Sequence, residues 1–162
     1  MNSDFKELLR IFAEEKVKYL IIGGYAVAKH SEPRYTKDLD IWISSSRENA
    51  ERVFHALKEF GAPLDNIEIE DFTRSTLVFQ MGIEPVRIDI LMGLKELDFD
   101  ECWERRATAK ISEIEIYFIS LDDLIYNKKL AGRPQDLRDA ENLELKKREQ
   151  SKIEKPLPKS DE

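Results

Sequence analysis

A chain of 162 residues is long enough for one ordinary domain with its own hydrophobic core and too short for two. Its 41% hydrophobic and 36% charged residues exclude a disordered chain, and its net charge of -7 argues against a broad, nonspecific nucleic-acid groove. The single cysteine, Cys102, excludes an intramolecular disulfide and fits a reducing cytoplasm. We expect one domain over residues 1–150 and a polar, disordered tail over residues 151–162.

Neither membrane insertion nor secretion is expected. No apolar run approaches the roughly 20 residues that span a bilayer, and the N-terminal residues lack a basic stretch followed by an apolar one. We therefore predict a cytoplasmic protein. Four basic residues close together in the sequence can supply a local positive surface, and these are Lys128, Lys129, Arg133 and Arg138.

The chain opens with a helix, a strand and a second helix. Hydrophobic residues at helical spacing predict an amphipathic helix over residues 5–15. Residues 19–22 are typical of a buried strand, which the pair Gly23-Gly24 stops. A short helix over residues 25–30 follows.

A polar loop with a proline, residues 31–37, then leads into a strand over residues 38–43. The serines at 44–46 are suitable N-caps for a helix over residues 51–60, and Gly61 supplies its C-terminal stop.

The second half of the chain contains three expected strands and two expected helices, over residues 76–80, 86–92, 111–119, 121–130 and 134–147. We expect the first two of these strands to form a hairpin through residues 81–85.

Three carboxylates stand on two of the expected strands. Alternate side chains of a strand point to opposite faces, so Asp38 and Asp40 project together. The same alternation sends Ile88 and Ile90 to the core and Asp89 to the opposite side. If the two strands are neighbours, at about 4.8 Å, all three carboxylates converge. Like charges that close raise one another's pKa or require a cation. A hard divalent ion with oxygen ligands is the favoured solution, so we predict a site for one or two magnesium ions.

The diglycine adds an anion site. A glycine pair between a strand and a helix places backbone N–H groups and a helix N-terminus beside the carboxylates. Phosphate beside metal-binding carboxylates describes a nucleoside triphosphate site. One ion held by Asp38 and Asp40 would bridge the triphosphate, and a second would activate an acceptor hydroxyl with Asp89 as ligand or base. The residues after Gly23 match neither a P-loop nor a dinucleotide-binding glycine pattern.

Three short motifs stand in order along the chain: Ile22-Gly23-Gly24, Asp38-Leu39-Asp40 and Ile88-Asp89-Ile90. Together they resemble the nucleotidyltransferase domain of the DNA polymerase beta superfamily. The resemblance implies an α/β (α+β) fold, with a mixed β-sheet, helices packed on one side and further helices at the C-terminus. It also implies two magnesium ions and transfer of a nucleoside monophosphate from a triphosphate such as ATP to a hydroxyl acceptor, with release of pyrophosphate.

A narrower resemblance rests on two further strings, Arg34-Tyr35-Thr36-Lys37 and the segment from Lys128 to Asp139. They are similar to small bacterial nucleotidyltransferase-like proteins, including those of abortive-infection and toxin–antitoxin type. This implies a phosphate contact for Lys128, a supporting acidic role for Asp136 and a cognate antitoxin as partner. Arg34 and Thr36 are candidates for nucleotide contact, with loop ordering as the alternative role.

Three functions are compatible with these motifs. The first is a magnesium-dependent nucleotidyltransferase whose acceptor is RNA, a protein or a small molecule. The second is a catalytically weak or inactive module of a toxin–antitoxin or phage-defence pair that binds nucleotide or a partner protein. The third is a two-metal phosphohydrolase or nuclease, because the same carboxylates can activate water.

Overall fold

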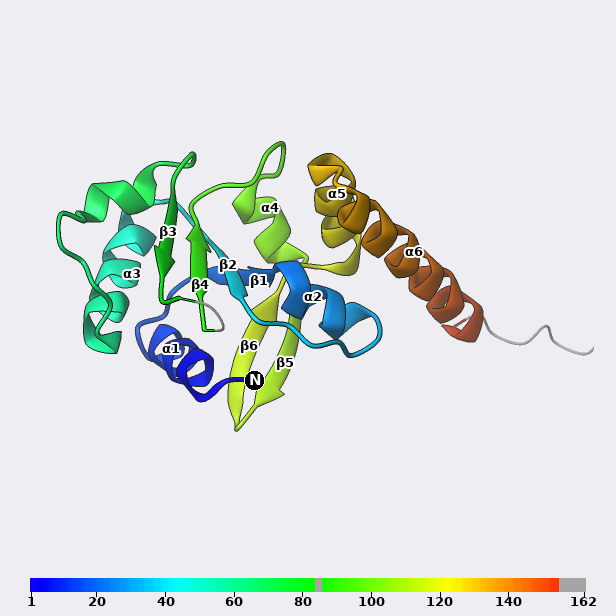
Figure 1. Ribbon diagram of the computed structural model, residues 1–162, viewed down its shortest axis with the longest axis horizontal. Helices are drawn as coiled ribbons and strands as arrows, with labels where there is room; N and C mark the ends of the chain where they lie inside the picture. Colours follow the sequence, from blue (N-terminus) through cyan, green and yellow to red (C-terminus); the bar gives the residue numbers. More distant parts are fainter. Residues whose placement is uncertain (84–85, 155–162) are drawn as a thin grey trace, which may run out of the picture.

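The computed structural model describes residues 1–83 and 86–154 (Figure 1). Two expectations fall partly outside these residues: positions 84–85 of the hairpin loop and positions 155–162 of the C-terminal tail. In the described part of the chain, no helix has both the length and the apolar composition needed to cross a membrane.

The described residues form six α-helices, one short 3₁₀ helix and six strands. In chain order they are α1 (Ser3–Glu14), β1 (Tyr19–Ile22), α2 (Gly23–His30), β2 (Leu39–Ile43), α3 (Arg47–Phe60), η1 (Ile69–Thr73), β3 (Val78–Met81), β4 (Ile88–Leu91), α4 (Phe99–Glu104), β5 (Ala107–Ile111), β6 (Ile114–Phe118), α5 (Leu121–Ala131) and α6 (Pro134–Glu154).

The strands make one mixed sheet in the order β3-β4-β2-β1-β6-β5. The pairs β1–β6 and β2–β4 are parallel, and the other neighbours are antiparallel. The predicted mixed sheet is therefore confirmed. Its centre consists of short, almost fully buried strands, which is typical of a sheet that is covered on both faces.

One face of the sheet packs against α1, α3 and η1. Tyr19 of β1 lies 5.5 Å from Phe12 of α1 between ring centroids, and Phe79 of β3 lies 5.8 Å from Phe72 of η1. Phe72 in turn contacts Phe54 of α3. These aromatic contacts join α1, α3 and η1 to both halves of the sheet and confirm the layer of helices expected on one side.

The other face is covered unevenly. Trp42 of β2 is buried and packs edge-on against Phe99 of α4, with 5.1 Å between ring centroids. Two residues earlier on the same face, Asp40 lines a cavity. Helices α5 and α6 stand at one end of the sheet, and α6 extends away from it (Figure 1).

The expected caps explain two helix boundaries. The hydroxyl of Ser46 accepts a hydrogen bond from the Asn49 N–H, so α3 begins four residues earlier than residue 51. Gly61 ends the same helix with φ of +93°.

Other boundaries differ from expectation. The strand expected over residues 111–119 contains β6 but begins too early, and β5, which pairs with β6 in an antiparallel hairpin through Ser112 and Glu113, was not expected. Both turn residues have positive φ, +50° and +68°, in a segment without the glycine or asparagine that signals such a turn. Helix α2 begins at Gly23 itself, and α6 continues to Glu154, four residues into the expected tail.

Candidate active site

The diglycine brings the start of α2 against the second strand. Gly23 has φ of +66°, and a Cβ atom at this position would overlap Oδ2 of Asp40. A Cβ atom on Gly24 would lie 2.6 Å from Cγ2 of Thr36. Both glycines are therefore needed for close packing against the segment that enters β2. Since Ile22 at the N-cap has no side-chain acceptor, the first N–H groups of α2 have no side-chain cap.

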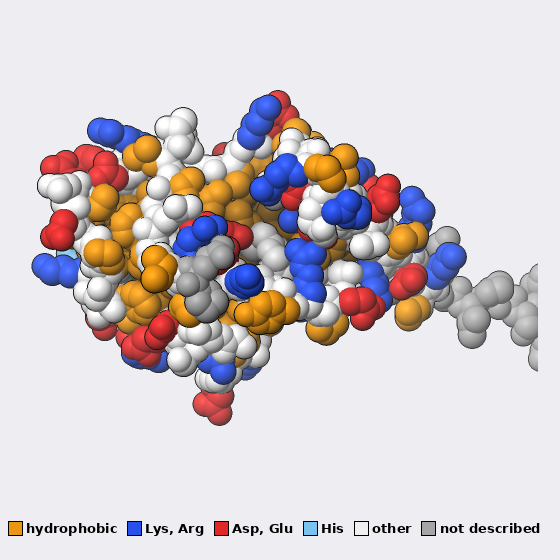
Figure 2. Space-filling model, viewed as in Figure 1, with side chains coloured by type: hydrophobic (Ala, Val, Ile, Leu, Met, Phe, Trp, Pro, Cys, Tyr) orange, Lys and Arg blue, Asp and Glu red, His pale blue; other side chains and the backbone are white. Residues whose placement is uncertain are grey.

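The two parallel strands β2 and β4 bring the carboxylates together. Asp40 and Asp89 are register partners, and Asp38 stands directly before β2. All three line a cavity of about 420 Å³ between the sheet and α5. Its other charged lining residues are Arg87, Lys128, Arg133 and Asp136. Figure 2 shows basic side chains gathered over α5 and α6 beside this part of the molecule.

The carboxylates are crowded and partly desolvated. Burial, followed by the charges of Asp89 and Asp38, raises the pKa of Asp40 to about 6. Asp89 is only 8% exposed. The site therefore carries more negative charge than its environment favours, and a cation would be stabilised there.

Arg87 supplies part of the missing positive charge. Its Nη2 lies 3.3 Å from Oδ2 of Asp38, and its Nε lies 3.1 Å from Oδ1 of Asp89. We call Asp38, Asp40, Asp89 and Arg87 the acidic cluster. Our sequence reasoning missed Arg87, although strand alternation places it on the same side as Asp89, two residues later.

A second group of charges ties the C-terminal helices to the loop before β2. Lys128 Nζ lies 3.4 Å from Asp136 Oδ1 and 3.2 Å from Asp139 Oδ2. Arg133 Nε donates to Asp136 Oδ2 at 2.6 Å, and Arg34 Nη1 donates to Asp139 Oδ1 at 2.8 Å. We call these five residues the balanced cluster, because each of its two carboxylates contacts two cations.

Both carboxylates of the balanced cluster are stabilised in their charged form. Burial alone would raise their pKa values, but hydrogen bonds outweigh it. Those from Arg133 and Lys128 lower the pKa of Asp136, and those from Arg34, Gln135 and Lys128 lower the pKa of Asp139. The two clusters adjoin, since the pKa of Arg133 is raised mainly by Asp136 and also by Asp40.

The structure gathers most, but not all, of the predicted site residues around one cavity. Those that line it are Gly23, Asp38, Asp40, Asp89, Lys128 and Asp136. Gly24 and Thr36 lie against each other and are not among its lining residues, and Arg34 is directed to Asp139 of α6. Arg133, Gln80 and Asn127 also line the cavity and had not been assigned to the site.

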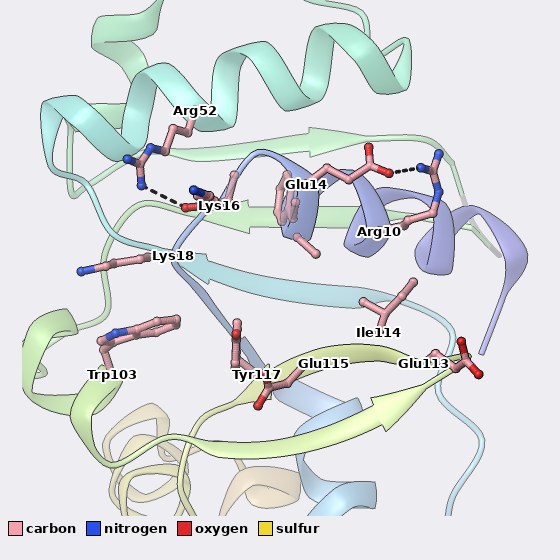
Figure 3. A pocket seen from close by; sticks show the side chains of 13 residues that line it. Arg10, Glu14, Lys16, Lys18, Arg52, Trp103, Glu113, Ile114, Glu115 and Tyr117 are labelled. Carbon is pink, nitrogen blue, oxygen red and sulfur yellow. Dashed lines mark hydrogen bonds and ion pairs between the residues drawn. The ribbon is translucent and has the colours of Figure 1, made fainter.

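A larger cavity of about 590 Å³ lies elsewhere, between the end of α1, α4 and the β5–β6 hairpin (Figure 3). Its arginines are engaged: Arg10 pairs with Glu14, and Arg52 donates to the Lys16 carbonyl at 3.1 Å. Arg106 covers the Trp103 ring at 4.0 Å, and Phe99 stacks on the same residue. With its arginines paired and its indole covered, this cavity offers less to a charged or aromatic ligand than the carboxylate cavity does.

Solved structures share this fold at low sequence identity. A protein from Thermotoga maritima described as a nucleotidyltransferase (TM1012) has a TM-score of 0.55 and 17% identity, covering 90% of this chain and 91% of its own. The lincosamide antibiotic adenylyltransferase LnuA, solved with lincomycin, has a TM-score of 0.55 and 15% identity, with 89% and 96% coverage. The antibiotic-resistance factor ANT(2'')-Ia has a TM-score of 0.58 and 14% identity, with 93% and 91% coverage. No curated protein matches the chain in sequence.

The family model identifies the chain as a nucleotidyltransferase. Residues 3–155 match the family described as nucleotidyltransferase of unknown function (DUF6036), and the chain belongs to that family. The predicted resemblance to nucleotidyltransferases is thereby confirmed, as is the assignment of the protein as a transferase enzyme that acts on nucleotides.

Proposed function

We propose that this protein transfers a nucleoside monophosphate from a triphosphate to a hydroxyl acceptor, with Mg²⁺ as cofactor and pyrophosphate as the second product. One observation carries the proposal. The register-paired Asp40 and Asp89 share a cavity with Lys128, Arg133 and the backbone of Gly23, so carboxylates for a metal lie beside cations for phosphate.

The donor set suits a hard divalent ion. Asp38, Asp40 and Asp89 provide only oxygen ligands, and burial together with the charges of Asp89 and Asp38 raises the pKa of Asp40. Within residues 1–83 and 86–154, no three acidic, histidine or cysteine side chains already have the spacing that holds a metal ion. These three aspartates would hold the ion once Arg87 moves. When bound, Mg²⁺ would neutralise phosphate charge and lower the pKa of the acceptor hydroxyl.

The other residues of the cavity would orient the triphosphate. Lys128 is 8% exposed and held by two carboxylates, so its ammonium group is fixed before substrate arrives. Arg133 adds a guanidinium, which can bind phosphate oxygens in pairs. The uncapped N–H groups at the start of α2 would bind a further phosphate oxygen.

Three classes of acceptor are considered, and the labelling experiment below distinguishes them. LnuA is a lincosamide adenylyltransferase, which brings a small hydroxylated molecule into consideration beside RNA and protein. The net charge of -7 weighs against RNA. A nucleoside triphosphate substrate and a free, buried cysteine support a cytoplasmic setting.

The test is to follow label from each α-³²P nucleoside triphosphate, with Mg²⁺, into separate RNA, protein and small-molecule fractions of a cell extract. We expect label in one fraction and stoichiometric pyrophosphate. Asp40→Ala should reduce transfer at least about a thousandfold. Asp65→Ala, which changes an exposed aspartate on the loop after α3, is the matched control and should not.

Equal transfer by Asp40→Ala and the wild type would remove Asp40 from the catalytic site. Free phosphate or cleaved nucleic acid in place of labelled acceptor would identify a hydrolase or nuclease. Absence of product from every fraction, together with capture of a specific partner protein, would favour the binding module of a toxin–antitoxin or phage-defence pair.

A further inference from the structure

Arg87 occupies the position where positive charge is most needed. Its Nη2 lies 3.3 Å from Oδ2 of both Asp38 and Asp89, while its Nε approaches the other oxygen of Asp89. One guanidinium thus bridges two carboxylates: that of Asp38, directly before β2, and that of Asp89, within the adjacent parallel strand β4. Its charge also opposes the rise in the pKa of Asp40.

A guanidinium in this place has two consequences. It engages carboxylate oxygens that a divalent ion would need, so an entering ion must displace it. It is also about one-third exposed and lines the cavity that contains Lys128 and Arg133, so its side chain has room to move toward a ligand there.

We propose that Arg87 is an internal counter-cation that competes with the divalent ion for Asp38 and Asp89, and that it binds phosphate when it leaves them. The inference rests on the proposed function for the identity of the ion and of the nucleotide. Guanidinium groups bind carboxylate and phosphate with the same paired hydrogen bonds, so the exchange replaces one set of contacts with an equivalent one.

The exchange couples the two ligands. A triphosphate that draws Arg87 into the cavity frees carboxylate oxygens for the metal, and a metal that displaces Arg87 makes it available to the triphosphate. By linkage, each ligand then increases the affinity for the other to the same extent. Before substrate arrives, Arg87 offsets part of the negative charge of the carboxylates without any bound ion.

The test measures the two ligands separately. Mn²⁺ affinity is determined by electron paramagnetic resonance without nucleotide, and ATP affinity is determined by calorimetry in EDTA, without metal. For Arg87→Gln we expect Mn²⁺ to bind at least about tenfold more tightly and metal-free ATP about tenfold more weakly. A residue with a merely structural role would not move the two affinities in opposite directions.

Two further variants sharpen the result. Arg87→Lys keeps the charge and should leave Mn²⁺ affinity within about threefold of the wild type. Arg133 lines the same cavity, but its ion pair is with Asp136 of the balanced cluster. Arg133→Gln should therefore weaken ATP binding with little gain in Mn²⁺ affinity.

Unchanged or weaker Mn²⁺ binding by folded Arg87→Gln, checked by circular dichroism, would overturn the inference. An equal gain in Mn²⁺ affinity by Arg133→Gln would also overturn it, because it would indicate a general effect of positive charge in the cavity and not direct competition for the carboxylates. Neither measurement requires nucleotide transfer, so a protein that transfers nothing but shows the opposed shifts would refute the proposed function and leave the role of Arg87 standing.

Discussion

The acidic cluster and the balanced cluster adjoin the same cavity, yet the pKa values of their carboxylates are shifted in opposite directions. In the balanced cluster, Lys128 and its neighbours lower the pKa of both carboxylates, so the charged form is the stable one. In the acidic cluster, Arg87 faces three carboxylates and the pKa of Asp40 stays high, at about 6. The carboxylates of the balanced cluster are compensated by cations, whereas the acidic cluster keeps an excess of negative charge.

This difference separates a structural role from a binding role. A balanced set of buried ion pairs holds α5, α6 and the loop before β2 in a single arrangement, and losing one partner leaves charge without compensation. An excess of carboxylates costs folding free energy and is retained where a ligand later supplies the missing charge. The two clusters should therefore respond to charge removal with opposite signs.

The largest effect is expected at the balanced cluster. Asp139 is 2% exposed and accepts hydrogen bonds from Arg34 and Gln135, beside its ion pair with Lys128. Asp139→Asn should lower the free energy of unfolding by about 3 kcal/mol, because a buried ion pair loses one partner. Urea denaturation at pH 7 measures the change.

The control for that variant is Asp122→Asn. Asp122 pairs with Lys147 at 2.6 Å, but both side chains are more than half exposed, so its loss should cost less than about 1 kcal/mol. If Asp139→Asn destabilised the protein no more than Asp122→Asn does, the cluster would not hold the helices together.

The acidic cluster should respond in the opposite direction. Asp40→Asn should raise the free energy of unfolding of the metal-free protein by roughly 2 kcal/mol at pH 8, because a pKa of about 6 lies well above the ordinary 3.8. Between pH 4 and pH 6 the folded protein holds a proton on Asp40 that the unfolded chain has lost, so wild-type stability falls as pH rises through this window.

The gain from Asp40→Asn should accordingly disappear at pH 4 and be complete above pH 6. Thermal unfolding in EDTA over that range gives the profile for both proteins. A variant that is less stable than the wild type at pH 8 would mean that Asp40 contributes to the fold, and the proposed contrast between the clusters would fail.

Two glycines allow the packing around Asp40 to be tested separately from its charge. Gly23 and Gly61 both have positive φ, but a Cβ atom on Gly61 would meet no other atom within 4 Å, whereas one on Gly23 would overlap Asp40. Gly61→Ala should cost about 1–2 kcal/mol for the backbone alone. Gly23→Ala should cost about 1–2 kcal/mol more and should also weaken Mn²⁺ binding. Equal costs in urea denaturation would show that Gly23 does not set the position of Asp40.

Much of the fold was predictable because the strand patterns are strict. Alternation around Asp40 and Asp89 indicates which side of each strand is buried, and the parallel pairing of β2 and β4 brings the two residues into register. The hairpin of β5 and β6 was not predictable in the same way. No glycine marks the turn at Ser112 and Glu113, so the expected strand runs from Ile111 through the turn into β6 and leaves out the rest of β5.

The same limit applies to the site. Neighbouring strands place backbone positions, so the meeting of Asp38, Asp40 and Asp89 could be inferred from the sequence. The pairing of Arg34 with Asp139 joins residues 105 positions apart and depends on how α6 docks, for which the sequence offers no periodic signal. Charge balance is likewise a property of the packed side chains: strand alternation places Arg87 on the side of Asp89, but only the structure shows that it contacts both Asp38 and Asp89.

The smallest expected effect comes from a partly buried group outside both clusters, which separates the effect of burial from that of ion pairing. His30, at the end of α2, contacts the Ile119 carbonyl through Nε2 at 2.8 Å, and burial lowers its pKa. As pH falls below about 6.5 the unfolded chain gains a proton before the folded protein does, so stability should decline with a slope below about 1.4 kcal/mol per pH unit. His30→Gln keeps a hydrogen-bond donor and should remove the contribution of His30 to the slope between pH 7 and pH 5. An unchanged slope in the variant would assign the titration to the charge clusters instead.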